Sequence, residues 1–193
     1  GFVDSPISGE HNASNFLVSY GIASEFGVSF NNIVSYFNEF KGVKRRLELI
    51  KNFSDIKIYD DFAHHPTAIK KTIEALRNTA RKKVSTAKLN RLIVVFEPRS
   101  NTLKLGHDKH RLAESFKDAD VIYIYDGSVN WDVKSSFSEL GQKVYVESNV
   151  QNILQRLLSQ VCIGDTILFM SNGDFQGILQ AFVEMLESKQ VQR

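Results

Sequence analysis

The sequence has 193 residues, a length that fits one domain of ordinary size or one domain with part of another. Hydrophobic residues make up 42% of it and charged residues 24%, which excludes a largely disordered protein. No apolar run approaches the roughly 20 residues that span a bilayer. The formal net charge of +2 is too small to predict a nucleic-acid partner. We therefore expect a folded protein that binds neither nucleic acid nor a membrane.

The single cysteine, Cys162, excludes an internal disulfide and a zinc site built from cysteine pairs, and it favours a reducing compartment. The chain begins with Gly1 in place of Met, and its first residues lack the basic and apolar segments of a signal peptide. We expect a piece of a longer, cytoplasmic protein.

In chain order, two helical segments come first, at 10–26 and 30–40, and an edge strand is expected at 45–50. Short apolar runs rich in β-branched and aromatic residues follow, typical of buried parallel strands. These runs are 56–59, 92–96, 121–125, 144–146 and 166–170. Helical patterns alternate with them, at 66–78, 108–118, 131–140, 149–160 and from Ile178 onward. The alternation predicts an α/β fold with a Rossmann-like, open, mostly parallel sheet and flanking helices. The basic stretch 79–90 is expected to be a solvated loop.

Ligands of such a sheet bind beyond the carboxyl ends of its strands, and the residues there are polar. Asp60, Asp61, His64 and His65 follow the run at 56–59 and open a helix. Asp and His are metal ligands, but Asp can also accept hydrogen bonds from a ribose, and His can contact phosphate at a helix start. A third interpretation is that one Asp caps the turn while one His packs against the protein or is solvated.

Two further strand ends carry polar segments. Arg99 has a planar guanidinium that matches a carboxylate, and Ser100, Asn101 and Thr102 add donors and acceptors, so an anionic substrate fits. Ser171 and Asn172 begin a glycine-containing turn after the last strand. A surface ion pair and a plain turn remain the alternatives.

Upstream, Asn12 and Asn15 share a helical face beside His11, where they could bind an adenine edge or simply cap the helix. If 45–50 is a strand, Arg45 and Arg46 point to opposite faces, and at most one lines a given site. The sequence contains no Gly-Lys pair and therefore no P-loop, so a phosphate cradle must come from elsewhere.

The motifs become specific through their order. Gly-x-His-Asn-x-x-Asn is followed by Gly-Val-Lys-Arg-Arg-Leu-Glu, Asp-Asp-Phe-Ala-His-His-Pro-Thr-Ala-Ile, Glu-Pro-Arg-Ser-Asn-Thr and Ser-Asn-Gly. This set resembles the Mur ligase family, and within it the murein-recycling branch. The resemblance implies that residues 1–40 are the last helices of a central ATPase domain and 41–193 the C-terminal domain. The UDP-binding domain and the P-loop would lie upstream.

The resemblance also implies a reaction. ATP phosphorylates the lactyl carboxylate of UDP-N-acetylmuramate, and the amine of L-Ala-γ-D-Glu-meso-diaminopimelate attacks the acyl phosphate. Mg²⁺ would be held by ligands mostly outside this chain, with no metal site within it. The chain alone is expected to be inactive. Both substrates and the upstream domains are the partners expected.

The resemblance assigns roles to individual residues. It implies catalytic roles for Arg46, His64 and His65. Contacts to ATP are implied for His11, Asn12, Asn15, Arg46 and Asp61. Substrate contacts are implied for Arg99, Ser100, Asn101, Thr102, Ser171 and Asn172.

The last motif departs from the family's usual pattern. Asp174 and Gln176 stand where the family usually has glycine, which adds a negative charge near an anionic substrate. We also expect the domains to close on ATP about a hinge near Glu39 to Val43. Two alternatives stand beside the ligase: a non-catalytic nucleotide- or peptide-binding module, and a metal-dependent hydrolase built on Asp60, Asp61, His64 and His65.

Overall fold

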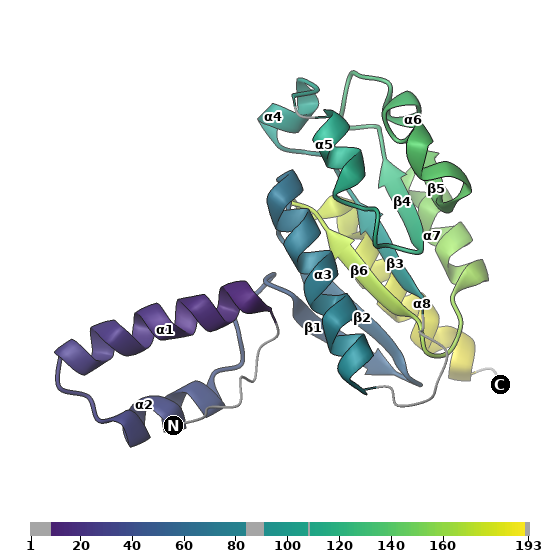
Figure 1. Ribbon diagram of the computed structural model, residues 1–193. Helices are drawn as coiled ribbons and strands as arrows, with labels where there is room; N and C mark the ends of the chain where they lie inside the picture. Colours follow the sequence, from purple (N-terminus) through teal and green to yellow (C-terminus); the bar gives the residue numbers. More distant parts are fainter. Residues whose placement is uncertain (1–8, 84–90, 108, 192–193) are drawn as a thin grey trace.

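A computed structural model describes residues 9–83, 91–107 and 109–191. Figure 1 shows a sheet flanked by helices on both faces, with a pair of helices standing to one side of it. The pair consists of α1 (Glu10–Glu25) and α2 (Phe30–Glu39), which we call the hairpin. The hairpin and the sheet-bearing part are joined by residues 40–47.

Within the described residues, the sheet has six strands in the order β1-β2-β6-β3-β4-β5. They are β1 (Glu48–Phe53), β2 (Ile56–Asp61), β3 (Leu92–Phe96), β4 (Val121–Tyr125), β5 (Val144–Glu147) and β6 (Thr166–Met170). The pairs β2–β6, β6–β3, β3–β4 and β4–β5 are parallel, whereas β1 runs antiparallel to β2 at the edge. The predicted α/β fold with an open, mostly parallel sheet is confirmed.

The two faces of the sheet carry separate apolar cores. Successive residues of a strand point to opposite faces, and β3 shows it: Val94 packs in one core and Val95 in the other, both fully buried. On one face lie α3 (Pro66–Lys83), α4 (Asn101–Lys104), α5 (Lys109–Glu114), α6 (Val133–Ser136) and the 3₁₀ helix η1 (Ser138–Lys143) (Figure 1). On the other lie α7 (Val150–Gln160) and α8 (Ile178–Val191), the latter preceded by the 3₁₀ helix η2 (Phe175–Gly177). Each fully buried aliphatic side chain contributes about 1.5–3 kcal/mol, so this double core fixes the positions of the strand ends.

Several predicted boundaries differ from the structure. The helix expected at 108–118 ends at Glu114, and the one expected at 131–140 is divided into α6 and η1. The helix α3 continues through Lys83, into the stretch 79–90 that was expected to be a loop, because Ala, Arg and Lys are good helix formers and no breaker interrupts them. Residues 84–90 lie outside the described part. The edge strand spans Glu48–Phe53 and not 45–50, because Arg45 and Leu47 have φ angles of 58° and 50°, outside the β region.

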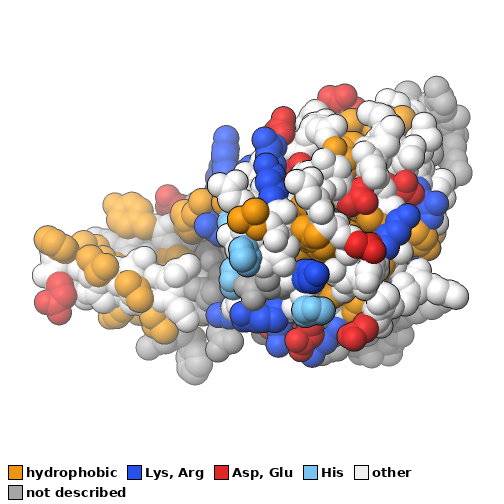
Figure 2. Space-filling model, turned by 90° about the horizontal axis from the view of Figure 1, so that it is seen from above, with side chains coloured by type: hydrophobic (Ala, Val, Ile, Leu, Met, Phe, Trp, Pro, Cys, Tyr) orange, Lys and Arg blue, Asp and Glu red, His pale blue; other side chains and the backbone are white. Residues whose placement is uncertain are grey.

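The hairpin is held together by aromatic contacts. The rings of Phe16 and Phe37 lie 3.8 Å apart between centroids, and Ser29 caps α2 by accepting the N–H of Asn32. Much apolar surface stays uncovered, with Leu17 65% and Phe26 84% exposed. Figure 2 shows this as hydrophobic side chains along the hairpin. Within the described ranges, no helix combines the length and apolarity that crossing a membrane requires.

Candidate functional site

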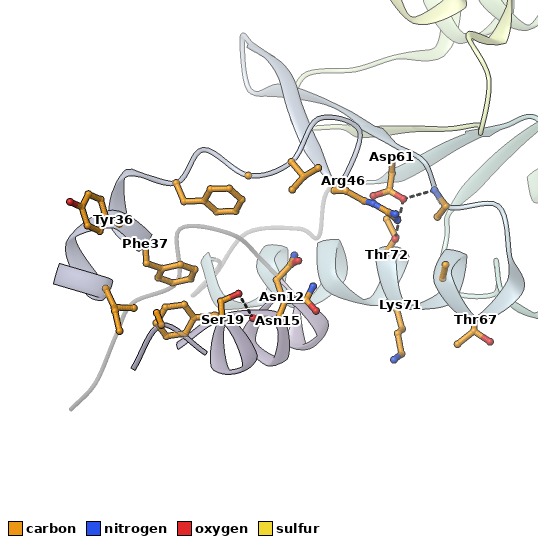
Figure 3. A pocket seen from close by; sticks show the side chains of 18 of the residues that line it. Asn12, Asn15, Ser19, Tyr36, Phe37, Arg46, Asp61, Thr67, Lys71 and Thr72 are labelled. Atoms are coloured by element: carbon orange, nitrogen blue, oxygen red, sulfur yellow. Dashed lines mark hydrogen bonds between the residues drawn. The ribbon is translucent and has the colours of Figure 1, made fainter. Parts of the chain in front are cut away.

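An open cleft of about 1010 Å³ separates the hairpin from the start of α3, and we call it the cleft (Figure 3). Asn12 and Asn15 project into it from α1, side by side. Arg46 enters from the opposite side, from the turn before β1, and reaches toward Asp61. The structure therefore brings together Asn12, Asn15, Arg46 and Asp61, which the sequence placed in one site. The side chain of His11, predicted beside them, lies outside the described part.

The walls of the cleft are partly apolar and partly cationic. Phe16, Ile33 and Phe37 line it from the hairpin, whereas Lys71 and Arg46 line it from the sheet-bearing part. Figure 2 shows Lys, Arg and His side chains gathered where the hairpin meets the rest of the molecule. Such a cleft can hold a flat apolar ring at one end and an anionic group at the other. Lys71 and the aromatic wall could not be predicted from the sequence, because a Lys on a helix is usually solvated and aromatic residues on a helix usually pack in a core.

Asp61, at the end of β2, is only 4% exposed, and the structure uses both of its carboxylate oxygens. Oδ2 accepts the N–H of Leu47 at 2.6 Å, and Oδ1 accepts the N–H of Ala63 at 2.7 Å and the hydroxyl of Thr72 at 3.4 Å. Burial raises the pKa of Asp61, although these donors and Arg46 act against the rise. Asp61 thus fixes the backbone of the turn before β1 and of the segment after β2, both on the sheet-bearing side of the cleft.

The turn at 43–47 sends two neighbouring arginines to different places. Arg46 lines the cleft, whereas Arg45 lines a smaller hollow of about 280 Å³. The prediction that they diverge is confirmed, but the cause is the left-handed backbone at Arg45 and Leu47 and not strand alternation. These costly conformations are held by the carboxylates of Glu48, which accepts the N–H of Arg45 at 2.8 Å, and of Asp61.

Arg45 connects three segments. Its Nη2 donates to the carbonyls of Ser171 and Gly173, both at 2.6 Å, and its Nε donates to Asp60 at 3.1 Å. Burial raises the pKa of Asp60, and the neighbouring Arg45 opposes that rise. Arg45 therefore ties the turn before β1 to the loop after β6. No local pattern in the chain indicated this role.

The two histidines after β2 take different places. His64 Nδ1 lies 3.0 Å from the carbonyl of Phe62, which can only accept, so this nitrogen carries the hydrogen. His65 Nδ1 accepts the N–H of Thr67 at 3.3 Å, and His65 lines the cleft. With Asp60 and Asp61 also engaged, the metal-hydrolase interpretation gains no support. Among the described residues, no three His, Cys, Asp or Glu side chains could hold a metal ion together.

Arg99 and the loop 171–174 form a second polar region, which we call the rim. Arg99 follows β3 and the loop follows β6, and these strands are neighbours. Arg99 Nη1 donates to Asp174 Oδ1 at 3.0 Å. This hydrogen bond lowers the pKa of Asp174. Ser171 Oγ donates to Glu97 Oε2 at 2.5 Å, with both side chains buried.

The other residues predicted for substrate binding differ in their exposure and in their hydrogen bonds. Ser100 caps α4 by accepting the N–H of Leu103 at 3.3 Å, so its hydroxyl has a structural task. Asn101 and Thr102 begin α4 and are exposed. Asn172 has a buried Oδ1 without a hydrogen-bond partner in the structure.

Residues 45–173, more than half of the chain, match the family described as Mur ligase, glutamate ligase domain. The chain belongs to the Mur ligase family. The match begins at Arg45 and ends at Gly173, the two residues whose contact links the turn before β1 to the rim.

Two curated relatives are similar to nearly the whole chain. The chain is 34% identical over 184 residues to a UDP-N-acetylmuramate–L-alanyl-γ-D-glutamyl-meso-2,6-diaminoheptandioate ligase of Haemophilus influenzae, covering 95% of this chain and 39% of that protein. It is 37% identical over 182 residues to the ligase of the same name from Escherichia coli, covering 94% of this chain and 38% of that protein. The chain thus spans about two fifths of the length of these curated relatives.

A solved structure is similar to this chain in both sequence and fold. A murein peptide ligase from Psychrobacter arcticus is 35% identical and superposes with a TM-score of 0.69. The alignment covers 95% of this chain and 38% of that one. This Mur ligase relative therefore shares both the sheet-bearing part and most of the hairpin.

Proposed function

We propose that this chain is the C-terminal part of an ATP-dependent carbon–nitrogen ligase that joins UDP-N-acetylmuramate to L-Ala-γ-D-Glu-meso-diaminopimelate in peptidoglycan recycling. The observation that carries the proposal is the cleft, where Asn12 and Asn15 of the hairpin face Arg46. The relatives that bear this activity in their names match nearly the whole chain. Residues 1–40 would belong to the central ATPase domain and 41–193 to the C-terminal domain.

The side chains of the cleft fit ATP. The aromatic wall of the hairpin offers a surface for a base, and the amides of Asn12 and Asn15 offer a donor and an acceptor each for its edge. Arg46 and Lys71 supply positive charge for phosphates. Because Asp61 binds the N–H of Leu47, it would act on ATP by holding Arg46 in place as much as by contacting the ribose.

The proposed reaction has two steps, phosphorylation of a carboxylate and attack of an amine on the acyl phosphate. A carboxylate oxygen of UDP-N-acetylmuramate attacks the γ-phosphorus of ATP, and ADP leaves. The acceptor amine attacks the acyl carbon, loses a proton, and expels phosphate through a tetrahedral intermediate. Arg46 would stabilise the negative charge that develops on the transferred phosphoryl group. His65, which lines the cleft, and His64, its neighbour in the chain, are candidates to hold the proton of the attacking amine.

The acceptor peptide would lie along the rim. It carries several carboxylates, and Arg99 presents a half-exposed guanidinium at the carboxyl ends of the strands. Asn101, Thr102 and the amide of Asn172 would add hydrogen bonds. The unpartnered Oδ1 of Asn172 supports this, because a buried acceptor is costly when left unpaired.

The remaining components of the enzyme would be supplied by upstream domains. Mg²⁺ would screen the phosphates through ligands mostly from these domains, which would also carry the P-loop and the UDP-binding site. The enzyme would work in the cytoplasm, where both substrates and ATP occur. Closure about the segment Glu39 to Val43 would adjust the distance between the hairpin and Arg46.

The test uses the full-length protein. Incubated with ATP, Mg²⁺, UDP-N-acetylmuramate and the tripeptide, it should release ADP and phosphate and form the coupled product, detected by mass spectrometry. Arg46→Ala should lower kcat, whereas Lys44→Ala, which changes a neighbouring exposed cation that does not line the cleft, should not. Nucleotide binding without any ligation would instead support a non-catalytic binding module.

A further inference from the structure

An opposite charge stands beside the arginine that the proposed function gives to the acceptor. Arg99 and Asp174 pair at 3.0 Å, yet both remain open to solvent, with side chains 46% and 81% exposed. Exposed ion pairs of this kind are weak and exchange readily with other charged partners. The pair therefore presents a positive and a negative group side by side on the surface.

The backbone beneath these two side chains is firmly held. Arg45 donates to the carbonyls of Ser171 and Gly173, and the N–H of Gly173 donates to Ser171 Oγ at 2.9 Å. Ser171 is in turn bound to Glu97, two residues before Arg99. The spacing of the two loops is thus fixed by buried contacts, while the charged ends stay free to rearrange.

Further contacts fix the flanks of the rim. The carbonyl of Pro98 accepts the hydroxyl of Ser128 at 3.1 Å, and Gln176 Nε2 donates to the Tyr125 hydroxyl at 2.9 Å. Gly173 leaves room for the guanidinium, since a Cβ there would lie 2.7 Å from Arg99 Cδ and closer still to Nη1. The two residues that replace the family's glycines therefore both make specific contacts, Asp174 within the rim and Gln176 at its flank.

We propose that Arg99 and Asp174 together form a subsite for a zwitterionic amino-acid end, in which Arg99 binds the carboxylate and Asp174 binds the ammonium group. This inference rests on the proposed function and names the part of the acceptor that the rim selects. Asp174 is then a specificity residue: it favours a carboxylate with an adjacent ammonium and repels a carboxylate alone.

The acceptor has such an end. The far end of meso-diaminopimelate in the tripeptide carries a free carboxylate and a free ammonium on one carbon. Replacing this residue by lysine removes that carboxylate and keeps the ammonium, and replacing it by 2-aminopimelate does the reverse. The two analogues therefore test the two halves of the subsite separately.

The experiment is an amide NMR titration of the 193-residue chain with the three peptides, for the wild type and Asp174→Asn. Asp174→Asn should weaken the tripeptide and the lysine peptide by about threefold to fivefold, as expected for an exposed charge pair. It should strengthen the 2-aminopimelate peptide, because Arg99 loses its competing carboxylate. Glu187→Gln, in the exposed pair with Lys51 away from the rim, is the matched control and should change none of the three.

The opposite signs are the decisive readout, because a merely structural role would move all three affinities in one direction. Equal changes for the three peptides, or no shift at the rim with millimolar tripeptide, would overturn the inference. Ligation by the full-length protein together with equal changes would remove the subsite and keep the proposed function. Absence of ligation would remove the proposed function on which the subsite rests.

Discussion

The cleft and the rim use charged side chains in opposite ways. In the cleft, Asp61 is 4% exposed and its oxygens bind the protein's own backbone, so its charge shapes the site from within. At the rim, the Asp174 side chain is 81% exposed and pairs with the half-exposed guanidinium of Arg99. The difference shows that carboxylates at the carboxyl ends of two neighbouring strands can have different tasks. One stabilises the fold of the site, and the other is available to bind a ligand.

The largest expected effect is on the architecture of the cleft. Asp61→Ala leaves the N–H groups of Leu47 and Ala63 without their buried acceptor, so we expect the free energy of unfolding to fall by about 3 kcal/mol. Urea denaturation of the 193-residue chain measures it. Asp61→Asn keeps one acceptor oxygen and should lose less; equal stability of wild type and Asp61→Ala would contradict the structural role.

A smaller effect is expected at the link between the two regions. Arg45→Ala removes the donor to two carbonyls of the loop after β6, and should cost about 2 kcal/mol of stability. Amide hydrogen exchange at Gly173 and Asp174 should become faster, because the loop loses its tether. Arg45→Lys should restore part of the protection, and unchanged exchange in Arg45→Ala would show that the tether is dispensable.

A substitution at Gly173 should change stability still less and yet weaken peptide binding. Gly173→Ala displaces the flexible end of Arg99 and not a backbone, so the free energy of unfolding should change by no more than about 0.5 kcal/mol. Tripeptide binding should nevertheless weaken, because Arg99 leaves Asp174. Gly21→Ala, whose Cβ would meet nothing within 4 Å, is the control expected to keep binding intact.

The smallest effect concerns pH. The hydrogen bond from Arg99 holds the pKa of Asp174 below its ordinary value of 3.8. A lowered folded pKa means that the pair is intact above the unfolded value and is lost as the pH falls through the folded one. The carboxyl carbon of Asp174, followed by NMR, should therefore titrate below 3.8, and Arg99→Gln should move its midpoint upward. A midpoint that Arg99→Gln leaves unchanged would show that the two groups do not interact in solution.

Much of the fold could be predicted from the sequence because its signals are local. Apolar runs such as Leu92–Phe96 can only be satisfied in a sheet covered on both faces, and helical periodicity fills the gaps between them. The boundary errors had local causes as well. Good helix formers extend α3 to Lys83, and the left-handed residues Arg45 and Leu47 delay β1 until Glu48.

Only part of the candidate site could be predicted from the sequence. Motif order indicated Asn12, Asn15, Arg46 and Asp61, and the structure places them around one cleft, but their roles stay predictions. The task of Arg45 and the pairing of Arg99 with Asp174 depend on contacts 126 and 75 positions apart in the chain. No local pattern carries such information. The sheet order that brings these residues together can be seen only in the folded protein.

That sheet order also has a consequence for how the protein is made. The strand β6 lies between β2 and β3, although it is the last of the six strands in the chain. A nascent chain leaving the ribosome therefore holds β2 and β3 without their shared neighbour until residues 166–170 have emerged. The exposed edges of these apolar strands could pair wrongly during that interval. The turn of Arg45 and the rim would gain their connection only when synthesis has passed Gly173, so both regions of the site would mature together and late.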